Sequence, residues 1–248
     1  MQLSLQGIHK SYGEKKILNG INADIEPGSL LSITGVNGAG KTTILNILTG
    51  ICGLDQGEVL FENQAFHRDN VEQRKKLYYL SDNADLFMEK NILENIAIRL
   101  KLWDVDTSPE SKINDKVMLW LEEFDLIEHA NSHLATLSRG QYYKASLICL
   151  LAVDPELWLI DEPFASGMDP QGISMFKKYA KAATERGNTV IYTTQLLDLA
   201  EKFSNQIWVL DDQELKINCT TDQLSEFGNL ESLFSKLRDK ETSSTSSK

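Results

Sequence analysis

A glycine-rich turn between an apolar run and an amphipathic segment constrains this chain most. The segment Gly35–Thr42 has the sequence GVNGAGKT, which fits the pattern G-x-x-x-x-G-K-[ST] of a phosphate-binding loop. An apolar run at 29–34 predicts a strand before the loop, and apolar residues at helical spacing predict a helix over about 41–49. A glycine-rich turn with no ligand would not need a strand directly before it and a helix directly after it. We therefore expect an α/β core that binds nucleotide phosphates.

The residue types in the loop each have a chemical use. Its glycines permit backbone turns that point successive N–H groups inward, which forms an anion-binding nest. Lys41 supplies a positive charge for the β- and γ-phosphates, and the Thr42 hydroxyl can ligate Mg²⁺. The positive end of the following helix faces the same phosphates. ATP and Mg²⁺ are therefore the expected cofactors, and the expected nucleotide-binding residues here are Gly35, Asn37, Gly38, Ala39, Gly40, Lys41, Thr42 and Thr43.

Two carboxylates follow a second apolar run, at 157–160. The run predicts a short buried strand, so that Asp161 and Glu162 lie at its carboxyl end, where open α/β sheets bind ligands. Asp161 is expected to hold Mg²⁺ through water, and Glu162 to polarise the attacking water as the catalytic carboxylate. The same residues alone would fit an ordinary loop, but a phosphate-binding loop upstream favours the catalytic interpretation.

A third motif lies shortly before that strand. The segment Leu137–Gln141, LSRGQ, resembles the LSGGQ signature of the ATP-binding cassette (ABC) ATPases, with Arg139 in place of the first glycine. The chain therefore looks like the ATP-binding subunit of an ABC transporter. The resemblance implies that Ser138 and Gly140, with Gln141 beside them, face the γ-phosphate bound by a second nucleotide-binding subunit. Ser138 also fits the N-cap of a helix over about 139–153, and the two roles are compatible.

The resemblance implies two further nucleotide contacts. Tyr12 lies where the family places an aromatic side chain that stacks on adenine. The segment Ser166–Asp169 resembles the loop that follows the catalytic carboxylate and crosses the dimer interface. Asp169 also fits a helix N-cap followed by proline, so part of its role is structural.

Two positions depart from the family pattern. Asp82 stands where the family has a glutamine that touches Mg²⁺, so it is a candidate metal ligand that adds negative charge near a triphosphate. Gln195 stands where the family has a catalytic histidine; its amide can donate a hydrogen bond but cannot take up a proton near neutral pH. We expect ATP binding with slowed or altered hydrolysis. The alternative is that the amide serves equally well, because positioning dominates this chemistry.

Composition excludes some partners. The 25 basic and 36 acidic residues give a net charge of −11, which disfavours nucleic acid as a partner because phosphate backbones require clustered Lys and Arg. The cysteines, odd in number and far apart, indicate neither a disulfide framework nor a metal site. Without an apolar run long enough to span a bilayer, the chain is expected in the cytoplasm, peripheral at the inner face of the membrane through a permease subunit.

The predicted fold class is α/β: a P-loop NTPase core with a mostly parallel sheet, an antiparallel β subdomain and a helical subdomain. Residues 1–237 are expected to form one ABC ATPase domain, with the helical subdomain at about 82–136 and a polar, disordered tail at 238–248. Ser108 and Pro109 predict the start of a helix within that insertion. The segment 228–234 resembles the ending of exporter-type subunits.

A docking surface is expected in the same insertion. Leu86, Phe87 and Met88 are the candidate contacts for a membrane partner, unless these side chains are buried. The main functional hypothesis is an exporter-type ATPase subunit that dimerises around MgATP, as a homodimer or a heterodimer, and drives a separate transmembrane permease. The alternatives are an ABC ATPase without a membrane partner and a regulatory cassette with weak hydrolysis.

Overall fold

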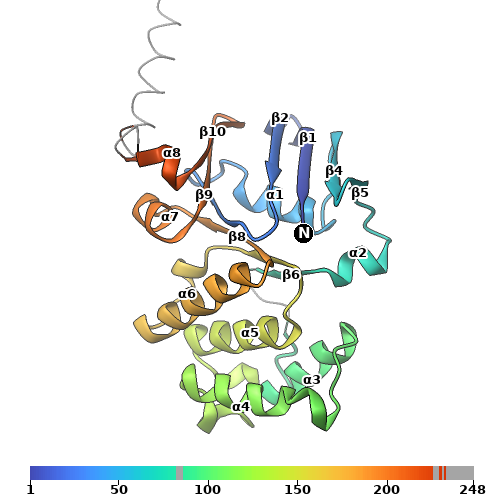
Figure 1. Ribbon diagram of the computed structural model, residues 1–248, viewed down its shortest axis with the longest axis vertical. Helices are drawn as coiled ribbons and strands as arrows, with labels where there is room; N and C mark the ends of the chain where they lie inside the picture. The colour runs from blue at the N-terminus through green and yellow to red at the C-terminus, as the bar shows by residue number, and fades with distance from the viewer. Residues whose placement is uncertain (82–85, 226–228, 231, 233–248) are drawn as a thin grey trace, which may run out of the picture.

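The computed structural model describes residues 1–81, 86–225, 229, 230 and 232 of the chain. Asp82 and the tail at 238–248 lie outside the described residues, as do residues 228, 231, 233 and 234 of the segment compared with exporter subunits. Within the described part, the strands form two sheets and the helices pack around them (Figure 1). The predicted α/β class, with a parallel sheet, an antiparallel sheet and helices, is confirmed.

The smaller sheet is antiparallel, in the order β2-β1-β4-β5. Its strands are β1 (Leu3–Tyr12), β2 (Lys15–Ile25), β4 (Gln56–Phe61) and β5 (Gln64–Ala65). The larger sheet has the order β10-β9-β3-β8-β7-β6, and all its pairs are parallel except that between β9 and β10. Its strands are β3 (Leu30–Thr34), β6 (Leu77–Leu80), β7 (Leu157–Ile160), β8 (Thr189–Thr194), β9 (Gln206–Asp211) and β10 (Glu214–Thr220).

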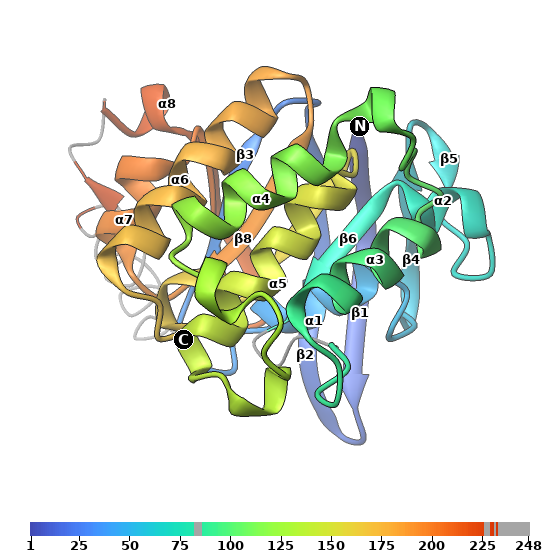
Figure 2. The same ribbon diagram turned by 90° about the horizontal axis from the view of Figure 1, so that it is seen from below.

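Helices cover the larger sheet and extend below it. They are α1 (Lys41–Leu48), α2 (Val71–Lys75), α3 (Ile92–Leu102), α4 (Ile113–Glu123), α5 (Arg139–Val153), α6 (Pro170–Glu185), α7 (Leu197–Phe203) and α8 (Thr221–Ser225), with short 3-10 turns at Pro109–Ser111, Ile127–His129, Leu134–Thr136 and Pro163–Ala165. Seen from below, α3, α4 and α5 lie in front of the strands (Figure 2). None of the described helices has the length and apolar character of a membrane span.

The core has two main parts, one on each side of the larger sheet. One cluster packs α1 between the two sheets and includes Leu5, Leu45 and Leu159. The other packs α3 to α6 under the sheet and includes Trp120, Ile148 and Trp158. Every residue of β3, β7 and β8 is buried, as expected for parallel strands covered on both faces. These rigid central strands carry the loops of the candidate site.

The helix start predicted at Ser108 and Pro109 belongs to a short 3-10 turn and not to an α-helix. Residues 109–111 form a 3-10 turn, and α4 begins only at Ile113, after Lys112 adopts a left-handed conformation with a φ of +53°. Ser108 precedes this turn without a side-chain capping hydrogen bond, and its backbone N–H and its hydroxyl both donate to the Asp106 carboxylate, at 2.8 and 3.0 Å. A local turn has therefore replaced the expected cap.

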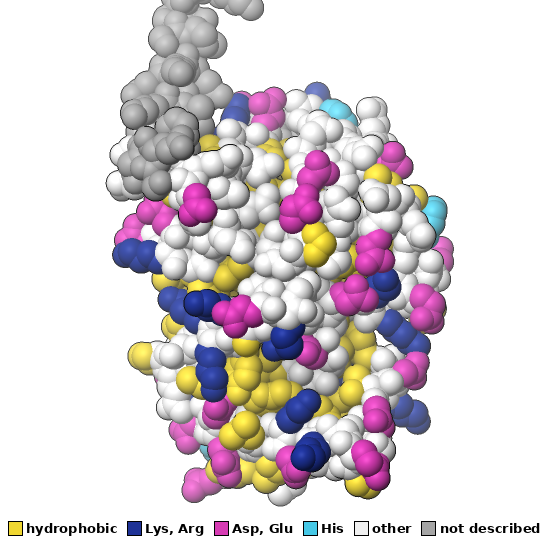
Figure 3. Space-filling view, in the orientation of Figure 1, with side chains coloured by type: hydrophobic (Ala, Val, Ile, Leu, Met, Phe, Trp, Pro, Cys, Tyr) yellow, Lys and Arg dark blue, Asp and Glu magenta, His cyan; other side chains and the backbone are white. Residues whose placement is uncertain are grey.

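The surface carries no single basic patch on the face seen in Figure 3, where acidic and basic side chains are interspersed. Apolar side chains gather in the lower half of that face. Of the candidate docking residues, Leu86 is buried, whereas Phe87 and Met88 are exposed.

Candidate functional site

The phosphate-binding loop joins the end of β3 to the start of α1, as predicted. Gly35 has a φ of +151°, and a Cβ at this position would lie 2.4 Å from the Leu210 carbonyl oxygen. A Cβ at Gly40, whose φ is +103°, would lie 2.8 Å from the Leu18 side chain. Glycine is therefore required at both positions by backbone conformation and by close packing. Asn37 and Gly38 are exposed at the tip of the loop, whereas Ala39 packs into the core.

Lys41 folds back over this loop. Its side chain is 7% exposed, and its Nζ donates to the carbonyl oxygens of Gly35 at 2.9 Å and Val36 at 3.3 Å. The same nitrogen lies 3.6 Å from Glu162 Oε1. The carbonyl groups of the loop thus hold an ammonium group next to the predicted catalytic carboxylate.

Asp161 connects the loop to two other elements. The Thr42 hydroxyl donates to Asp161 Oδ2 at 2.8 Å, although the two residues are 119 positions apart, and the Thr193 hydroxyl at the end of β8 donates to Oδ1. Hydroxyl and carboxylate oxygens are the ligands that Mg²⁺ prefers, and this pair is already in contact. Thr42 and Asp161 therefore fit a magnesium site beside the phosphate-binding loop.

Glu162 and Gln195 meet at the edge of this group. Glu162 has a φ of +47°, which is uncommon for a non-glycine residue, and its N–H donates to the Thr193 hydroxyl at 2.8 Å. Gln195 Nε2 donates to Glu162 Oε1 at 3.4 Å. The carboxylate predicted to polarise water is thus held between an ammonium and an amide. Thr193 was not singled out by the sequence, because a threonine that ends an apolar strand forms no motif.

Tyr12 ends β1 with its ring accessible. Its side chain is 51% exposed, and Lys10 Nζ lies 5.3 Å from the ring centroid. A hydrogen bond with the Cys52 side chain raises the pKa of the Tyr12 hydroxyl, with a smaller contribution from burial, while one with Thr43 opposes this increase. The hydroxyl therefore lies close to α1, and the exposed ring offers a face on which a base can stack.

The signature segment, residues 137–141, forms a capped helix start. Ser138 Oγ accepts the Gln141 N–H at 3.2 Å, and Gln141 Oε1 accepts the Ser138 N–H at 2.9 Å, so α5 begins with a capping box. The Gln141 amide nitrogen lies 2.9 Å from His129 Nε2. The predicted N-cap is confirmed. His129, which no sequence motif marks, holds the capping glutamine.

Gly140 and Asp169 belong to a second group, where α5 meets the start of α6. A Cβ at Gly140 would lie 2.4 Å from the Gly167 carbonyl oxygen. Asp169 caps α6 by accepting the Gly172 N–H at 2.7 Å, as predicted, and it pairs with Lys144 on α5. Of the predicted site residues, Asp82 alone lies outside the described residues.

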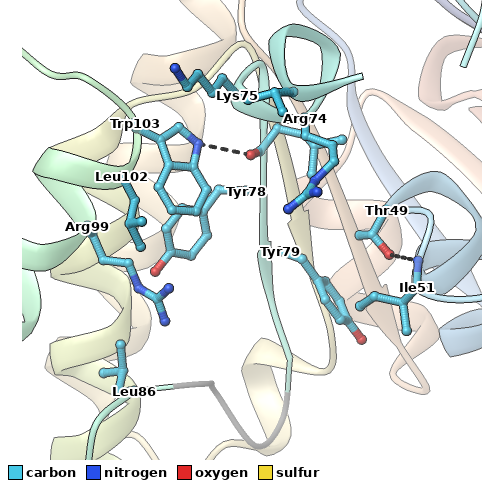
Figure 4. A pocket seen from close by; sticks show the side chains of 12 residues that line it. Thr49, Ile51, Arg74, Lys75, Tyr78, Tyr79, Leu86, Arg99, Leu102 and Trp103 are labelled. Atoms are coloured by element: carbon cyan, nitrogen blue, oxygen red, sulfur yellow. Dashed lines mark hydrogen bonds between the residues drawn. The ribbon is translucent and has the colours of Figure 1, made fainter. Parts of the chain in front are cut away.

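A groove opens between the core and α3 (Figure 4). This cavity of about 480 Å³ is lined by residues of β6, α2 and α3 and of the segment after α1. Arg99 lies with its guanidinium carbon 5.8 Å from the ring centroid of Tyr78, and Trp103 Nε1 donates to the Leu77 carbonyl at 3.2 Å. Apolar side chains at its rim, Ile51, Val71 and Leu102, are more than half exposed. The groove thus combines unburied apolar surface with basic side chains.

The family model and the similar proteins point to the same family. A family model described as ABC transporter matches residues 18–165. The chain is 24% identical to the ABC-type transporter ATP-binding protein EcsA of Bacillus subtilis, over 90% of this chain and 89% of that one. It is 28% identical to the linearmycin resistance ATP-binding protein LnrL of the same species, over 91% of this chain and 72% of that one.

An import protein matches equally well. The sulfate/thiosulfate import ATP-binding protein CysA of Bacillus cereus is 29% identical over 91% of this chain, which spans 63% of the length of that relative. Among solved structures, the ATP binding subunit of an ABC transporter has a TM-score of 0.87 at 22% identity, and the alignment covers 96% of this chain and 100% of that one. The protein cbiO1 from Clostridium perfringens, described as part of the ABC transporter complex cbiONQ, has a TM-score of 0.74 at 21% identity, with coverages of 95% and 93%. These likenesses show a shared fold.

Proposed function

The chain belongs to the ABC transporter family of ATP-hydrolysing cassettes, and we propose that it is the ATP-binding and ATP-hydrolysing subunit of a membrane transporter. The observation that carries this proposal is the convergence of Thr42, Asp161 and Glu162 beside one phosphate-binding loop. These residues lie far apart in the sequence, and their meeting provides the charge and the oxygen ligands that phosphoryl transfer needs.

Different residues of the site bind the adenine, the phosphates and the metal ion. The adenine stacks on Tyr12, and the loop N–H groups with the Lys41 ammonium hold the β- and γ-phosphates. Thr42 and Asp161 would hold Mg²⁺, which would supply positive charge to neutralise these phosphates. Asp82, by its place in the family pattern, would complete the metal environment.

Hydrolysis depends on Glu162. Its carboxylate, placed by a left-handed turn next to Lys41, accepts a hydrogen bond from the attacking water and orients it toward the γ-phosphate. Gln195 donates to the same carboxylate and is within reach of the phosphate side of the site. Ser138 and Gly140 of a second subunit would close the site from the opposite side, aided by the positive end of α5.

Gln195 tunes this reaction. Because its amide cannot accept a proton at neutral pH, we expect Gln195→His to raise kcat on the order of tenfold, which corresponds to about 1.4 kcal/mol of barrier. Phosphate release by the purified chain with MgATP measures kcat, and Gln206→His, at the start of β9, is the control. An unchanged kcat in Gln195→His would show that the amide serves as well as a histidine.

We propose that a segment of the permease binds in the groove of Figure 4. The apolar rim suits the apolar side of an amphipathic helix, and Arg74 and Arg99 favour acidic residues on its other side. This position would link partner movement to β6, the strand that leads toward the candidate metal ligand Asp82. The subunit would thus be peripheral at the inner face of the membrane, and export is the direction favoured by the resemblance at 228–234.

Disrupting the groove is expected to release the protein from the membrane. Leu102→Glu places a charge on a side chain that is 53% exposed at the rim, so burial there by a partner becomes unfavourable. In the cells that make the protein, the membrane-bound fraction should fall at least about tenfold, the equivalent of about 1.4 kcal/mol. Met118→Glu is the matched control, because Met118 is 45% exposed on α4 and does not line the groove. Equal loss from both variants would contradict docking at this groove.

A further inference from the structure

An ion pair joins the second turn of α5 to the first turn of α6. Lys144 Nζ lies 2.5 Å from Asp169 Oδ2, and the Lys144 side chain is 4% exposed. The other oxygen, Asp169 Oδ1, accepts the Gly172 N–H at 2.7 Å. The hydrogen bond from Lys144 lowers the pKa of the Asp169 carboxyl, so the group is ionised at neutral pH. One carboxylate therefore caps α6 and holds a buried ammonium of α5.

Two glycines let these elements approach closely. A Cβ at Gly140 would lie 2.4 Å from the Gly167 carbonyl oxygen, and a Cβ at Gly172 would lie 2.8 Å from Lys144 Cε. A larger residue at Gly140 would push the two backbone segments apart, whereas one at Gly172 would displace the Lys144 side chain. The signature segment and the segment 166–169, named here the Asp169 segment, are thus packed backbone to backbone beside the ion pair.

The Asp169 segment is also tied to the catalytic strand. It begins four residues after Glu162, and the buried Ser166 hydroxyl donates to the Pro163 carbonyl at 2.7 Å. A short, hydrogen-bonded turn is therefore all that separates the Asp169 segment from Glu162. On its other side, Lys144 lies one turn beyond Gln141, whose side chain completes the capping box of the signature segment.

The stability of the fold does not by itself explain a lysine at position 144. Buried ion pairs are often no more stabilising than apolar side chains of similar volume, because the charges must be removed from water. The Asp169 side chain is 50% exposed, so its side of the pair is accessible at the surface while the ammonium is enclosed. A second subunit could therefore contact the Asp169 carboxylate directly, while the ammonium remains enclosed.

We propose that Lys144 is a positioning residue that makes the signature segment and the Asp169 segment move as one unit. The proposal rests on the proposed function, in which each signature segment completes the ATP site of the other subunit. Lys144 then couples the site that its chain completes to the site that holds its own Glu162. The two ATP sites of a dimer would respond to each other through this pair.

Cooperativity of ATP hydrolysis measures the coupling. The wild-type chain should show a Hill coefficient clearly above 1 and up to about 2, the number of sites, and a coefficient of 1 in an active wild type would refute the coupling. Lys144→Met should bring the coefficient to 1 and lower kcat at least about tenfold, because a small misplacement of catalytic groups is costly. Lys144→Arg, which keeps the charge, should restore most of both. Lys178→Met removes another ion pair of α6, with Glu123, and should behave as the wild type.

A second variant keeps the test independent of folding. Asp169→Asn preserves the helix cap, since asparagine is an equally good N-cap, but removes the charge. It should lower the Hill coefficient as Lys144→Met does, and the double variant should show no additional loss. The unfolding midpoint of each variant identifies any that are misfolded. If Lys144→Met is one of these, the Hill coefficients of Lys144→Arg and Asp169→Asn test the proposal instead.

Three further results would overturn the proposal. They are wild-type cooperativity in Lys144→Met, no recovery in Lys144→Arg, and additive losses in the double variant. A wild-type chain that neither hydrolyses ATP nor dimerises with it would refute the proposed function instead. A cooperative wild type with equally cooperative variants would refute the coupling alone.

Discussion

Glu162→Gln is expected to reduce ATP turnover by about 10²- to 10⁴-fold, the contribution typical of a positioned general base. The amide keeps the size of the side chain but cannot accept a proton from the attacking water. ATP affinity should stay the same or increase, because the substitution removes a negative charge that lies 3.6 Å from Lys41 Nζ. Phosphate release and equilibrium ATP binding together measure the two effects.

Glu156→Gln is the matched control for this substitution. Glu156 immediately precedes the strand that delivers Glu162, and its carboxylate pairs with Lys76 at the surface. The same chemical change at that end of β7 should leave turnover within about twofold, because surface ion pairs contribute little. If Glu162→Gln retained wild-type turnover, another group would have to orient the water.

Lys41→Met is expected to weaken ATP binding by about 10- to 100-fold, since hydrogen bonds to charged groups contribute about 1.5–3 kcal/mol. Methionine fills the space of the lysine stem, which is almost fully buried, so the loss reflects the charge and its hydrogen bonds. Titration calorimetry with MgATP in the Glu162→Gln background, where turnover is too slow to consume the ligand, measures the affinity.

Lys202→Met is the control for the loss of one positive charge. Lys202 lies on α7, its side chain is 74% exposed, and it pairs with Asp198 one turn earlier in the same helix. ATP affinity should not change in this variant. A Lys41→Met chain that bound ATP as tightly as the wild type would exclude the loop as the main phosphate site.

Local patterns predicted the parts of the fold that are decided locally. The strand at 157–160 and the helix at 139–153 have the bounds that the sequence indicates, because Ser138 caps the helix and the apolar run ends at Asp161. The start predicted at Pro109 is that of a 3-10 turn, and α4 begins at Ile113, after the left-handed Lys112. Serine followed by proline can begin either a 3-10 turn or an α-helix, and the sequence pattern is the same for both.

Contacts between distant elements could not be found in this way. Thr193, His129 and Lys144 each act through a partner from another part of the fold, and none lies in a recognisable motif. The groove likewise forms where β6, α2 and α3 meet, whereas the sequence indicated only the segment around Leu86. Such sites depend on tertiary packing, which a one-dimensional pattern does not encode.

In the proposed cycle, two chains close around MgATP, and each signature segment completes the other's site. Light scattering of the Glu162→Gln chain during size exclusion detects this closure as a change of mass. We predict the mass of one chain, 27.9 kDa, without nucleotide or with ADP, and twice that mass with MgATP. Adding Lys41→Met should restore the single-chain mass at the same ATP concentration. A Glu162→Gln chain that binds MgATP and still elutes at 27.9 kDa at every protein concentration would contradict the account.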